Sequence, residues 1–441
     1  RSAWVADDAL ITLRSVQNFV DGYGPRWNVA DRVQTFTHPL WMLGLSSVTW
    51  VTGDLVLAAH VLGLLCTAGA LYLVTRVGAT AAVAVRGSVT LTGSRAFIDY
   101  SASGLENPLT HLLLAAFAWL LIHRSRERNN FAALVLIASL AMVNRMDTAL
   151  LVAPALAIVG WGQTRTIGWA ATARRVALWS SPLCLWLGFA ALYYGTPFPI
   201  AAYAKAFCSG VPAGELAEQA GRYYAWTWRH DPITLLAITA GLGAAILWGR
   251  ALRPLGLGAV LYLVYLFRIG GDFMGGRFFA APLLCAVLGG MVAIQRLQPR
   301  VTWLACVSAL LAWWPGGEPT LSAARPDYEN RRIEADGIAD ERGFYYRQFG
   351  WLSDSPNQIL PFGTLDLAIA RERAAGRNKV PDVRIVPGYA IGAMAVWLGR
   401  DGYLLDPLLC DPLLARLPGF DLTNWRIGHV RRRLPAGYLA S

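Results

Sequence analysis

Ten apolar runs, separated by loops that carry arginine, constrain the fold of this sequence more than any other feature. They fall near residues 55–75, 77–95, 107–122, 131–143, 148–161, 176–194, 233–249, 254–267, 278–294 and 301–314. About 20 apolar residues in a helix cross the ~30 Å hydrocarbon layer of a bilayer. The runs therefore predict a multi-pass α-helical membrane protein. Several runs are shorter than this, so we expect some spans to be tilted or broken.

The composition agrees with a membrane protein. Hydrophobic residues make up 55% of the sequence and charged residues 15%, whereas about 25% of a soluble domain is charged. The formal net charge is +11. A nucleic-acid-binding protein would gather its cations on one polar face, but here they lie between apolar runs. We therefore expect membrane lipid, and no nucleic acid, among the partners.

The positions of the arginines predict a topology. Loops after alternate runs hold Arg76, Arg124, Arg126, Arg128, Arg165, Arg174, Arg175, Arg250, Arg253, Arg296 and Arg300. The positive-inside rule places these loops in the cytoplasm and the other loops outside. This topology requires the apolar stretch 39–52 to stay on one side of the membrane. Its start at Pro39 and its content of Trp41 and Trp50 favour a helix that lies at the membrane interface.

A change in character after Trp314 predicts two domains. Residues 1–314 would form the transmembrane domain, with 1–54 as an outer loop before about ten spans. Residues 315–441 are richer in charge and would form a small extracytoplasmic α+β domain.

The α+β prediction depends on short runs within that region. Val383–Val386 and Tyr403–Leu405 resemble strands, and Leu365–Ala375 has a helical pattern. At the other end, the abrupt polar segment Arg1–Asp8 leads us to expect that another helix precedes it.

Six cysteines show no pair at metal-ligand spacing. Cys208 and Cys410 would both face the oxidising outer side in this topology. A disulfide between them is one interpretation, and two free thiols are the alternative.

The adjacent carboxylates Asp7 and Asp8 are the first candidates for chemistry. Neighbouring carboxylates repel each other, and one pKa rises unless a cation lies close by. A general base or a metal ligand would explain the pair. The alternative is a solvated helix N-terminus, where acidic side chains are favoured.

A second group of ionisable residues lies at or near the outer ends of the predicted spans: Arg145, Asp147, Lys205, Arg268, Asp272 and Arg277. Charged side chains at membrane depth cost free energy, so those that occur there are usually functional or paired with an opposite charge. Several cations in one pocket would suit a phosphate or diphosphate. Pairing within Arg145–Asp147 and Arg268–Asp272 is the alternative.

Asp99 and Glu106 flank the segment 100–105, and Pro108 follows at the start of the next apolar run. Proline in the first turn of a helix, after a polar cap, favours a structural role for this segment.

Several of these motifs together resemble GT-C membrane glycosyltransferases, in particular the terminal β-(1→2) arabinofuranosyltransferases. The resemblance covers most of the chain. It lies in residues 4–14, 21–24, 27–28, 31–33, 37–41, 100–109, 144–147, 202–205, 270–278, 340–345, 406–408 and 411–418. Each motif alone is weak, but their order and shared outer location make the family assignment strong.

The resemblance implies a GT-C type bundle in the bacterial cell membrane that works on its extracytoplasmic side. The implied reaction is inverting transfer of a sugar, with arabinofuranose as the candidate, from a polyprenyl-phosphate donor to a cell-envelope glycan acceptor. A polytopic transporter or flippase of lipid or glycolipid is the alternative. Transporters bind their substrates near the bilayer midplane, whereas the ionisable residues here gather at one face.

The resemblance also implies roles for individual residues. Asp7 or Asp8 would be the general base that deprotonates the acceptor hydroxyl, and a divalent cation, Mg or Mn, would sit near the pair. The predicted donor-phosphate ligands are Lys205, Arg268, Arg277 and Arg145. The predicted substrate-binding residues, all within resembling segments, are Asp272, His38, Glu106 and Arg14.

Overall fold

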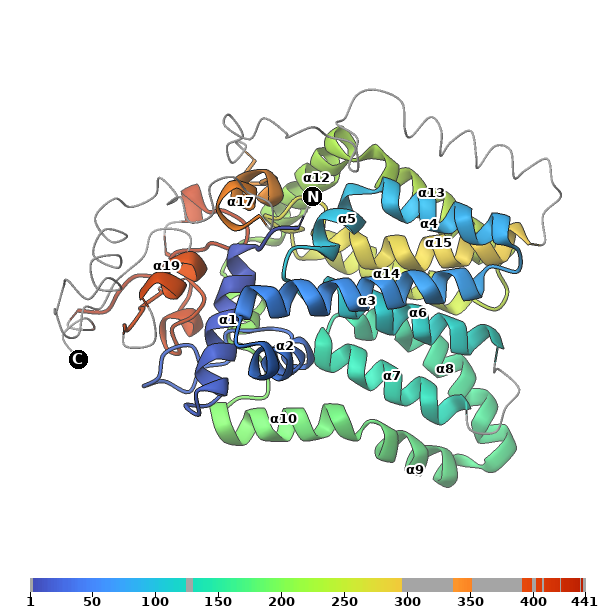
Figure 1. Ribbon diagram of the computed structural model, residues 1–441, viewed down its shortest axis with the longest axis horizontal. Helices are drawn as coiled ribbons and strands as arrows, with labels where there is room; N and C mark the ends of the chain where they lie inside the picture. The colour runs from blue at the N-terminus through green and yellow to red at the C-terminus, as the bar shows by residue number, and fades with distance from the viewer. Residues whose placement is uncertain are drawn as a thin grey trace.

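The structure is a computed structural model that describes residues 3–123, 130–295, 336–350, 391–398, 402–406, 408–420, 422–436 and 438. These residues form helices joined by loops, and no β-strand occurs among them (Figure 1). The predicted helical fold class is therefore confirmed.

Two helices precede the main bundle. Helix α1 spans Asp7–Val20 and α2 spans Pro39–Thr52. The ring of Pro39 suits the first turn of a helix, and Gly53 ends α2 in the left-handed conformation with φ 70°. The helix predicted for 39–52 is therefore present.

The bundle follows, and nine of the ten predicted apolar runs fall on its helices. In chain order the elements are α3 Leu55–Val77, α4 Ala81–Gly93, α5 Arg95–Ser101, α6 Asn107–His123, α7 Asn130–Asn144, α8 Thr148–Ile167, α9 Trp169–Trp179, α10 Ser181–Tyr194, α11 Ile200–Ala202, η1 Tyr203–Phe207, α12 Ala213–His230, α13 Pro232–Leu247, α14 Arg253–Arg268, η2 Arg277–Phe279 and α15 Ala280–Ile294. The tenth run, 301–314, lies outside the described residues.

Side-chain caps fix where several of these helices begin. Asp54, Thr80 and Ser94 precede α3, α4 and α5, and each accepts a hydrogen bond from the backbone N–H three residues further on. Such caps satisfy N–H groups that have no partner within the helix. The helix starts are therefore set by local sequence.

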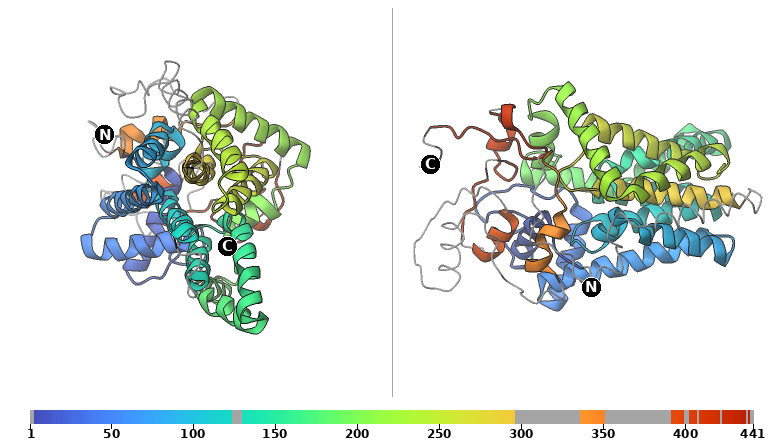
Figure 2. Two further views of the ribbon diagram at one scale, coloured as in Figure 1. Left: turned by 90° about the vertical axis from the view of Figure 1, so that its right-hand side faces the viewer. Right: turned by 90° about the horizontal axis from the view of Figure 1, so that it is seen from above.

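Helix α15 lies inside the bundle, and nearly all of its residues are buried (Figure 2). Helices α6, α13 and α14 pack against it. Gly258 of α14 approaches the backbone of Leu151 in α8 so closely that a Cβ there would overlap the Leu151 carbonyl. This contact brings α8 and α14 together beside the site described below.

Two helical segments are long and apolar enough to cross a membrane, Leu55–Val77 and Arg277–Ile294, each with a mean hydropathy of 1.9. Two bent pairs also pass when each pair is treated as one span: α9 with α10, bent by 55°, and α12 with α13, bent by 106°. These numbers apply to the described residues. The prediction of short or broken spans is met by these bends.

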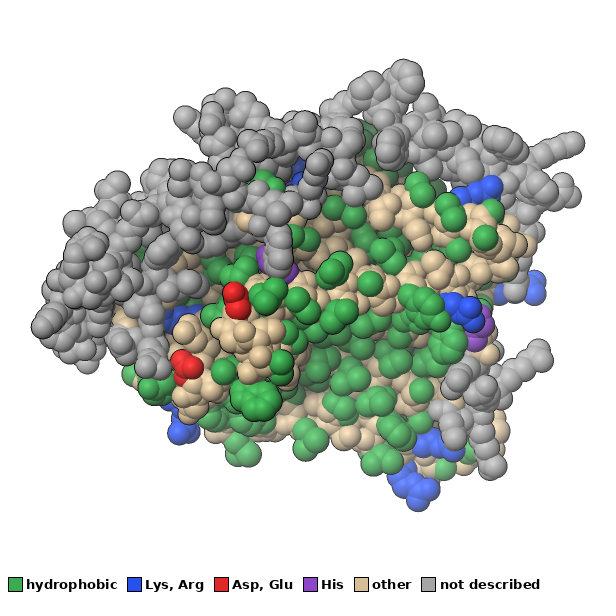
Figure 3. Space-filling view, viewed as in Figure 1, with side chains coloured by type: hydrophobic (Ala, Val, Ile, Leu, Met, Phe, Trp, Pro, Cys, Tyr) green, Lys and Arg blue, Asp and Glu red, His purple; other side chains and the backbone are tan. Residues whose placement is uncertain are grey.

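The outside of the bundle is apolar. Leu64, Leu65 and Leu192 are among many large hydrophobic side chains exposed there, and Figure 3 shows hydrophobic side chains over the flank of the molecule. An apolar exterior of this size is a membrane or interaction surface. The structure is therefore that of a helical membrane protein.

The C-terminal elements lie at the α1 end of the molecule (Figure 1). They are α17 Glu341–Phe349, α19 Ile391–Leu398, η3 Leu414–Arg416 and η4 Leu422–Asn424. Tyr403–Leu405 is not a strand. Val383–Val386, Leu365–Ala375 and the predicted domain boundary at 314/315 lie outside the described residues. The α+β domain therefore stays a prediction.

The cysteine interpretation needs a correction. Cys208 and Cys410 are both free, so the disulfide interpretation was wrong. Cys410 is buried in a turn around Asp406, whose carboxylate accepts a hydrogen bond from the Cys410 N–H at 3.0 Å. This turn fixes the backbone of Cys410 without a covalent partner.

Candidate active site

A cavity of about 270 Å³ opens at the α1 end of the bundle. Segments far apart in the sequence form its walls: α1, residues 35–38, residues 145–147, residues 199–211, the loop between α14 and η2, residues 409–410 and residues 425–432. Its charged lining residues are Asp8, Arg145, Asp147, Lys205, Asp272, Arg277 and Arg432. The structure thus brings most of the predicted site residues together.

The two adjacent aspartates diverge. Asp8 lines the cavity, with a quarter of its side chain exposed, and its Oδ2 lies 3.4 Å from Nη1 of Arg277. Asp7 is buried and accepts hydrogen bonds from the N–H groups of Gly392 and Ala393, at 3.1 and 2.8 Å, at the start of α19. Asp8 is therefore the carboxylate available for chemistry.

Burial raises the pKa of Asp7 to about 7, although hydrogen bonds from Ala393 and Gly392 oppose the rise. The two hydrogen bonds make Asp7 a cap for α19, and Asp7 is not among the residues that line the cavity.

Lys205 and Asp272 reach the cavity through irregular backbone. Lys205 lies in the π-helical turn η1, and such turns are frequent at functional sites. Asp272 follows Gly271, which has φ 75° and whose missing Cβ would lie 2.6 Å from the Tyr223 ring. A larger residue at 271 would therefore push the loop away from α12.

Asp272 is buried, and its Oδ2 makes no hydrogen bond among the described residues. Nη1 of Arg277 lies 4.0 Å from the same oxygen. Burial raises the pKa of Asp272 even though Arg277 and Lys205 oppose the rise. An orphaned carboxylate oxygen at a cavity wall is a ready acceptor for a ligand hydroxyl.

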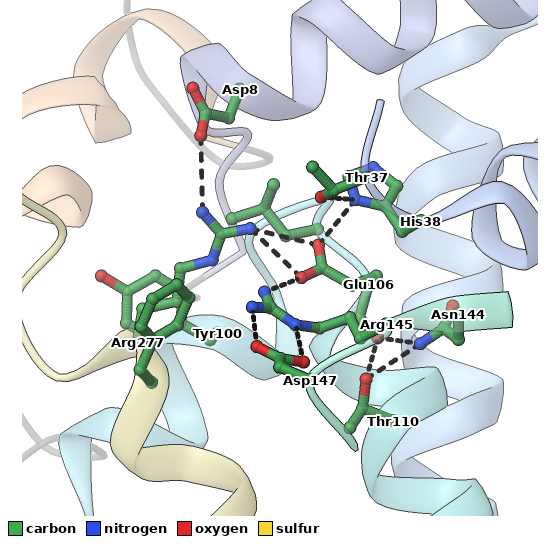
Figure 4. A network of polar contacts seen from close by, with 12 residues as sticks. Asp8, Thr37, His38, Tyr100, Glu106, Thr110, Asn144, Arg145, Asp147 and Arg277 are labelled. Carbon is green, nitrogen blue, oxygen red and sulfur yellow. Dashed lines mark hydrogen bonds and ion pairs between the residues drawn. The ribbon is translucent and has the colours of Figure 1, made fainter. Parts of the chain in front are cut away.

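The two arginines meet at Glu106 (Figure 4). Glu106 accepts hydrogen bonds from Nη1 of Arg145 at 2.6 Å and from Nη2 of Arg277 at 3.2 Å. Arg145 also pairs with Asp147, through Nε at 3.0 Å and Nη2 at 2.5 Å. Pairing of Arg145 with Asp147 was one of the two interpretations from sequence, and it coexists with a place at the cavity.

His38 joins the same network. Its Nδ1 lies 3.2 Å from Glu106, and its Nε2 lies 2.8 Å from the Thr12 hydroxyl. Burial lowers the pKa of His38 to about 4, although Glu106 opposes the shift. The imidazole is therefore neutral near pH 7, and it lines the cavity without adding charge.

Two predicted site residues lie elsewhere. Arg14 is buried and donates to the carbonyls of Trp27 at 2.9 Å, Ala395 at 3.0 Å and Gly402 at 2.6 Å. It ties α1 to the C-terminal segment. Arg268 is exposed in the last turn of α14 and is not among the cavity-lining residues.

Sequence reasoning missed the C-terminal wall of the cavity. Leu409, Cys410, Trp425, Ile427, Gly428, Val430 and Arg432 line it, although residues 315–441 were predicted as a separate domain. Nothing in the local sequence pattern pointed to this wall. The resemblance in 406–408 and 411–418 was the signal nearby.

Comparison with known proteins adds a family to this geometry. A terminal β-(1→2)-arabinofuranosyltransferase of Mycobacterium tuberculosis is 30% identical over 530 residues, covering 99% of this chain and 82% of the relative. The chain belongs to the terminal β-(1→2)-arabinofuranosyltransferase family. The enzyme of that name from Corynebacterium glutamicum is 30% identical over 332 residues, covering 65% of this chain and 47% of the relative. No family model and no solved structure matches.

As a member of the arabinofuranosyltransferase family, the chain is a glycosyltransferase. The resemblance read from the motifs is thus confirmed, and the transferase interpretation takes precedence over the transporter.

The surroundings of Asp7 and Asp8 do not provide the ligands that the implied divalent cation would need. Both oxygens of Asp7 accept backbone hydrogen bonds, and Asp8 faces a guanidinium. Over the described ranges, no group of three or more His, Cys, Asp or Glu side chains could hold a metal ion. Divalent cations prefer several oxygen ligands, so the steps below use none.

Proposed function

We propose that this chain transfers an arabinofuranosyl group from a polyprenyl-phosphate donor to a cell-envelope glycan, with inversion at the anomeric carbon. The names of both relatives support the sugar and the β-(1→2) linkage. The apolar bundle supports a lipid-borne donor, and we assign it to the GT-C type.

The observation that carries the proposal is that Asp8 shares one cavity with Arg145, Lys205 and Arg277. An inverting transfer needs a carboxylate on one side of the sugar, to take the proton of the acceptor hydroxyl. It needs cations on the other side, where negative charge develops on the departing phosphate. The cavity offers both.

The contact between Asp8 and Arg277 suggests an order of events. A donor phosphate that binds Nη1 of Arg277 replaces the Asp8 carboxylate, which now lies 3.4 Å away. Asp8 is then free to accept the hydrogen bond of the acceptor hydroxyl. In this scheme the donor binds first, and Lys205 closes on the phosphate from the exposed side.

We place the cavity on the extracytoplasmic side of the bacterial cell membrane. The loops whose arginines predict a cytoplasmic location contribute no residue to its lining. In intact cells, an impermeant thiol reagent should label a cysteine at exposed Glu218 and not one at exposed Thr166. The reverse labelling would invert the topology.

The central experiment compares Asp8→Asn with Asp7→Asn in a detergent assay of sugar transfer from a polyprenyl-phosphate donor. Loss of the base should reduce turnover by about 100-fold or more in Asp8→Asn. Asp7→Asn is the matched control, since it removes a neighbouring charge that faces α19. Substantial turnover by Asp8→Asn would refute the role of Asp8.

A further inference from the structure

Glu106 lies beneath the cavity rather than in its wall. Its side chain is completely buried, and it is not among the lining residues. It nevertheless contacts three residues that do line the cavity: Arg145, Arg277 and His38. The substrate-binding role predicted for Glu106 therefore does not match its position.

Charge explains why this carboxylate is needed. Two guanidinium groups that converge in a buried space repel each other, and removing either from water is costly. Glu106 accepts hydrogen bonds from Nη1 of Arg145 and from Nη2 of Arg277, and both guanidinium groups point toward its carboxylate (Figure 4). Burial opposes its ionisation, but Arg277 and Arg145 hold the pKa of Glu106 well below its usual range. The carboxylate is thus ionised at any physiological pH.

The two arginines depend on Glu106 to different degrees. Arg145 has a second, bidentate partner in Asp147. Arg277 has longer contacts besides Glu106, at 3.4 Å to Asp8 and 4.0 Å to Asp272. Among the carboxylates that the structure describes, Glu106 is therefore the one that fixes Arg277.

Neutral packing completes the arrangement. The centroid of the Phe278 ring lies 4.7 Å from Cζ of Arg145 and 5.8 Å from Cζ of Arg277. Both guanidinium groups therefore lie near one aromatic ring. Nδ1 of His38 lies 3.2 Å from Glu106, and the imidazole adds no charge near pH 7. The network thus holds two cations at the cavity with a single buried anion between them.

We propose that Glu106 is a positioning residue that holds Arg145 and Arg277 side by side for the donor phosphate and limits the contact between Arg277 and Asp8 to the one through Nη1, at 3.4 Å. This inference rests on the proposed function. Without the carboxylate, Arg277 would turn to the nearby anions Asp8 and Asp272. The phosphate site would lose its shape, and the base would stay in an ion pair.

The test is the variant Glu106→Gln, which keeps the size of the side chain and removes its charge. Because charge-assisted hydrogen bonds to Arg277 are lost, we expect the donor KM to rise about 10- to 100-fold. The readout is the KM for a polyprenyl-phosphate sugar, measured with the full chain, together with kcat and the thermal unfolding midpoint.

Asp99→Asn is the matched control. Asp99 is also buried and paired with two arginines, at 2.5 Å to Arg342 and 3.6 Å to Arg95, but it does not line the cavity. It should lose stability to a similar degree and keep the donor KM of the wild type. An unchanged KM in Glu106→Gln would overturn the inference and leave the proposed function intact.

Glu106→Asp covers the case in which Glu106→Gln does not fold. It retains the charge but withdraws the carboxylate by one methylene, so the donor KM should rise by a smaller factor. An unchanged KM here also overturns the inference. A wild-type chain that transfers nothing from a polyprenyl-phosphate donor would overturn the proposed function itself.

Discussion

At the scale of single residues, the environment of Asp7 makes a prediction about pH. Burial raises its pKa from 3.8 to about 7 in the folded chain. The folded state therefore binds a proton more tightly than the unfolded state does. The resulting stabilisation is complete below about pH 4 and disappears as the pH rises through about 7.

We therefore expect the unfolding midpoint of the wild type, relative to Asp7→Asn, to fall between pH 4 and pH 7. The comparison with the variant removes the effect of other titrating groups. Thermal unfolding followed over this range is the measurement. Two curves that stay parallel throughout would contradict the buried cap.

The sequence identified the residues of the site better than their roles. It singled out Asp7 and Asp8 as a pair, but successive residues on a helix point about 100° apart, so only one faces the cavity. Arg14 was predicted to bind substrate because it is a cation in a resembling segment. Its actual acceptors include Ala395, a contact across 381 positions that no local pattern reveals.

At the scale of helices, the contact between α8 and α14 makes a second prediction. A methyl group at Gly258 would overlap the Leu151 carbonyl, and such overpacking costs about 1–3 kcal/mol. Gly258→Ala should therefore lower the unfolding midpoint. It should also reduce transfer, because α8 begins directly after Arg145–Asp147.

Gly243→Ala in α13 is the control, because a Cβ there meets nothing within 4 Å. Alanine is favoured over glycine in a helix by roughly 0.5–1 kcal/mol, so this variant should be as stable as the wild type or more so. Equal destabilisation by both substitutions would show that the close approach of α8 and α14 does not matter.

The helices themselves were predictable because apolar runs and caps are local signals. The bend between α12 and α13 was also marked in the sequence, where Asp231 and Pro232 cap and begin a new helix. The bend at Ser180 is likewise accompanied by a proline, Pro182, in the first turn of α10. Its geometry comes from packing, including the hydrogen bond between the Leu183 N–H and the Ser139 hydroxyl of α7.

At the scale of the whole molecule, the C-terminal segment and the first helix form one site. Asp7 caps α19, Arg14 binds Gly402, and residues 409–410 and 425–432 line the cavity. The sequence could not predict this arrangement, because these contacts join segments that lie far apart in the sequence. The cavity therefore contains residues from both sides of the predicted domain boundary at 314/315.

The exposed charged side chains lie toward the two ends of the molecule. Figure 3 shows Lys and Arg side chains at the end of the bundle away from α1 and also at the α1 end, where the visible Asp and Glu side chains lie. The mixed charge at the α1 end agrees with a cavity that brings carboxylates and cations together.

The central claim is that a lipid phosphate binds between the arginines and Lys205 and takes the place of Asp8 at Arg277. A map of the full chain with a bound polyprenyl phosphate measures this directly. The account predicts phosphate oxygens within hydrogen-bond distance of Arg277 and Lys205, with Asp8 released from Arg277. A phosphate bound outside this cavity, with Asp8 still paired to Arg277, would contradict it.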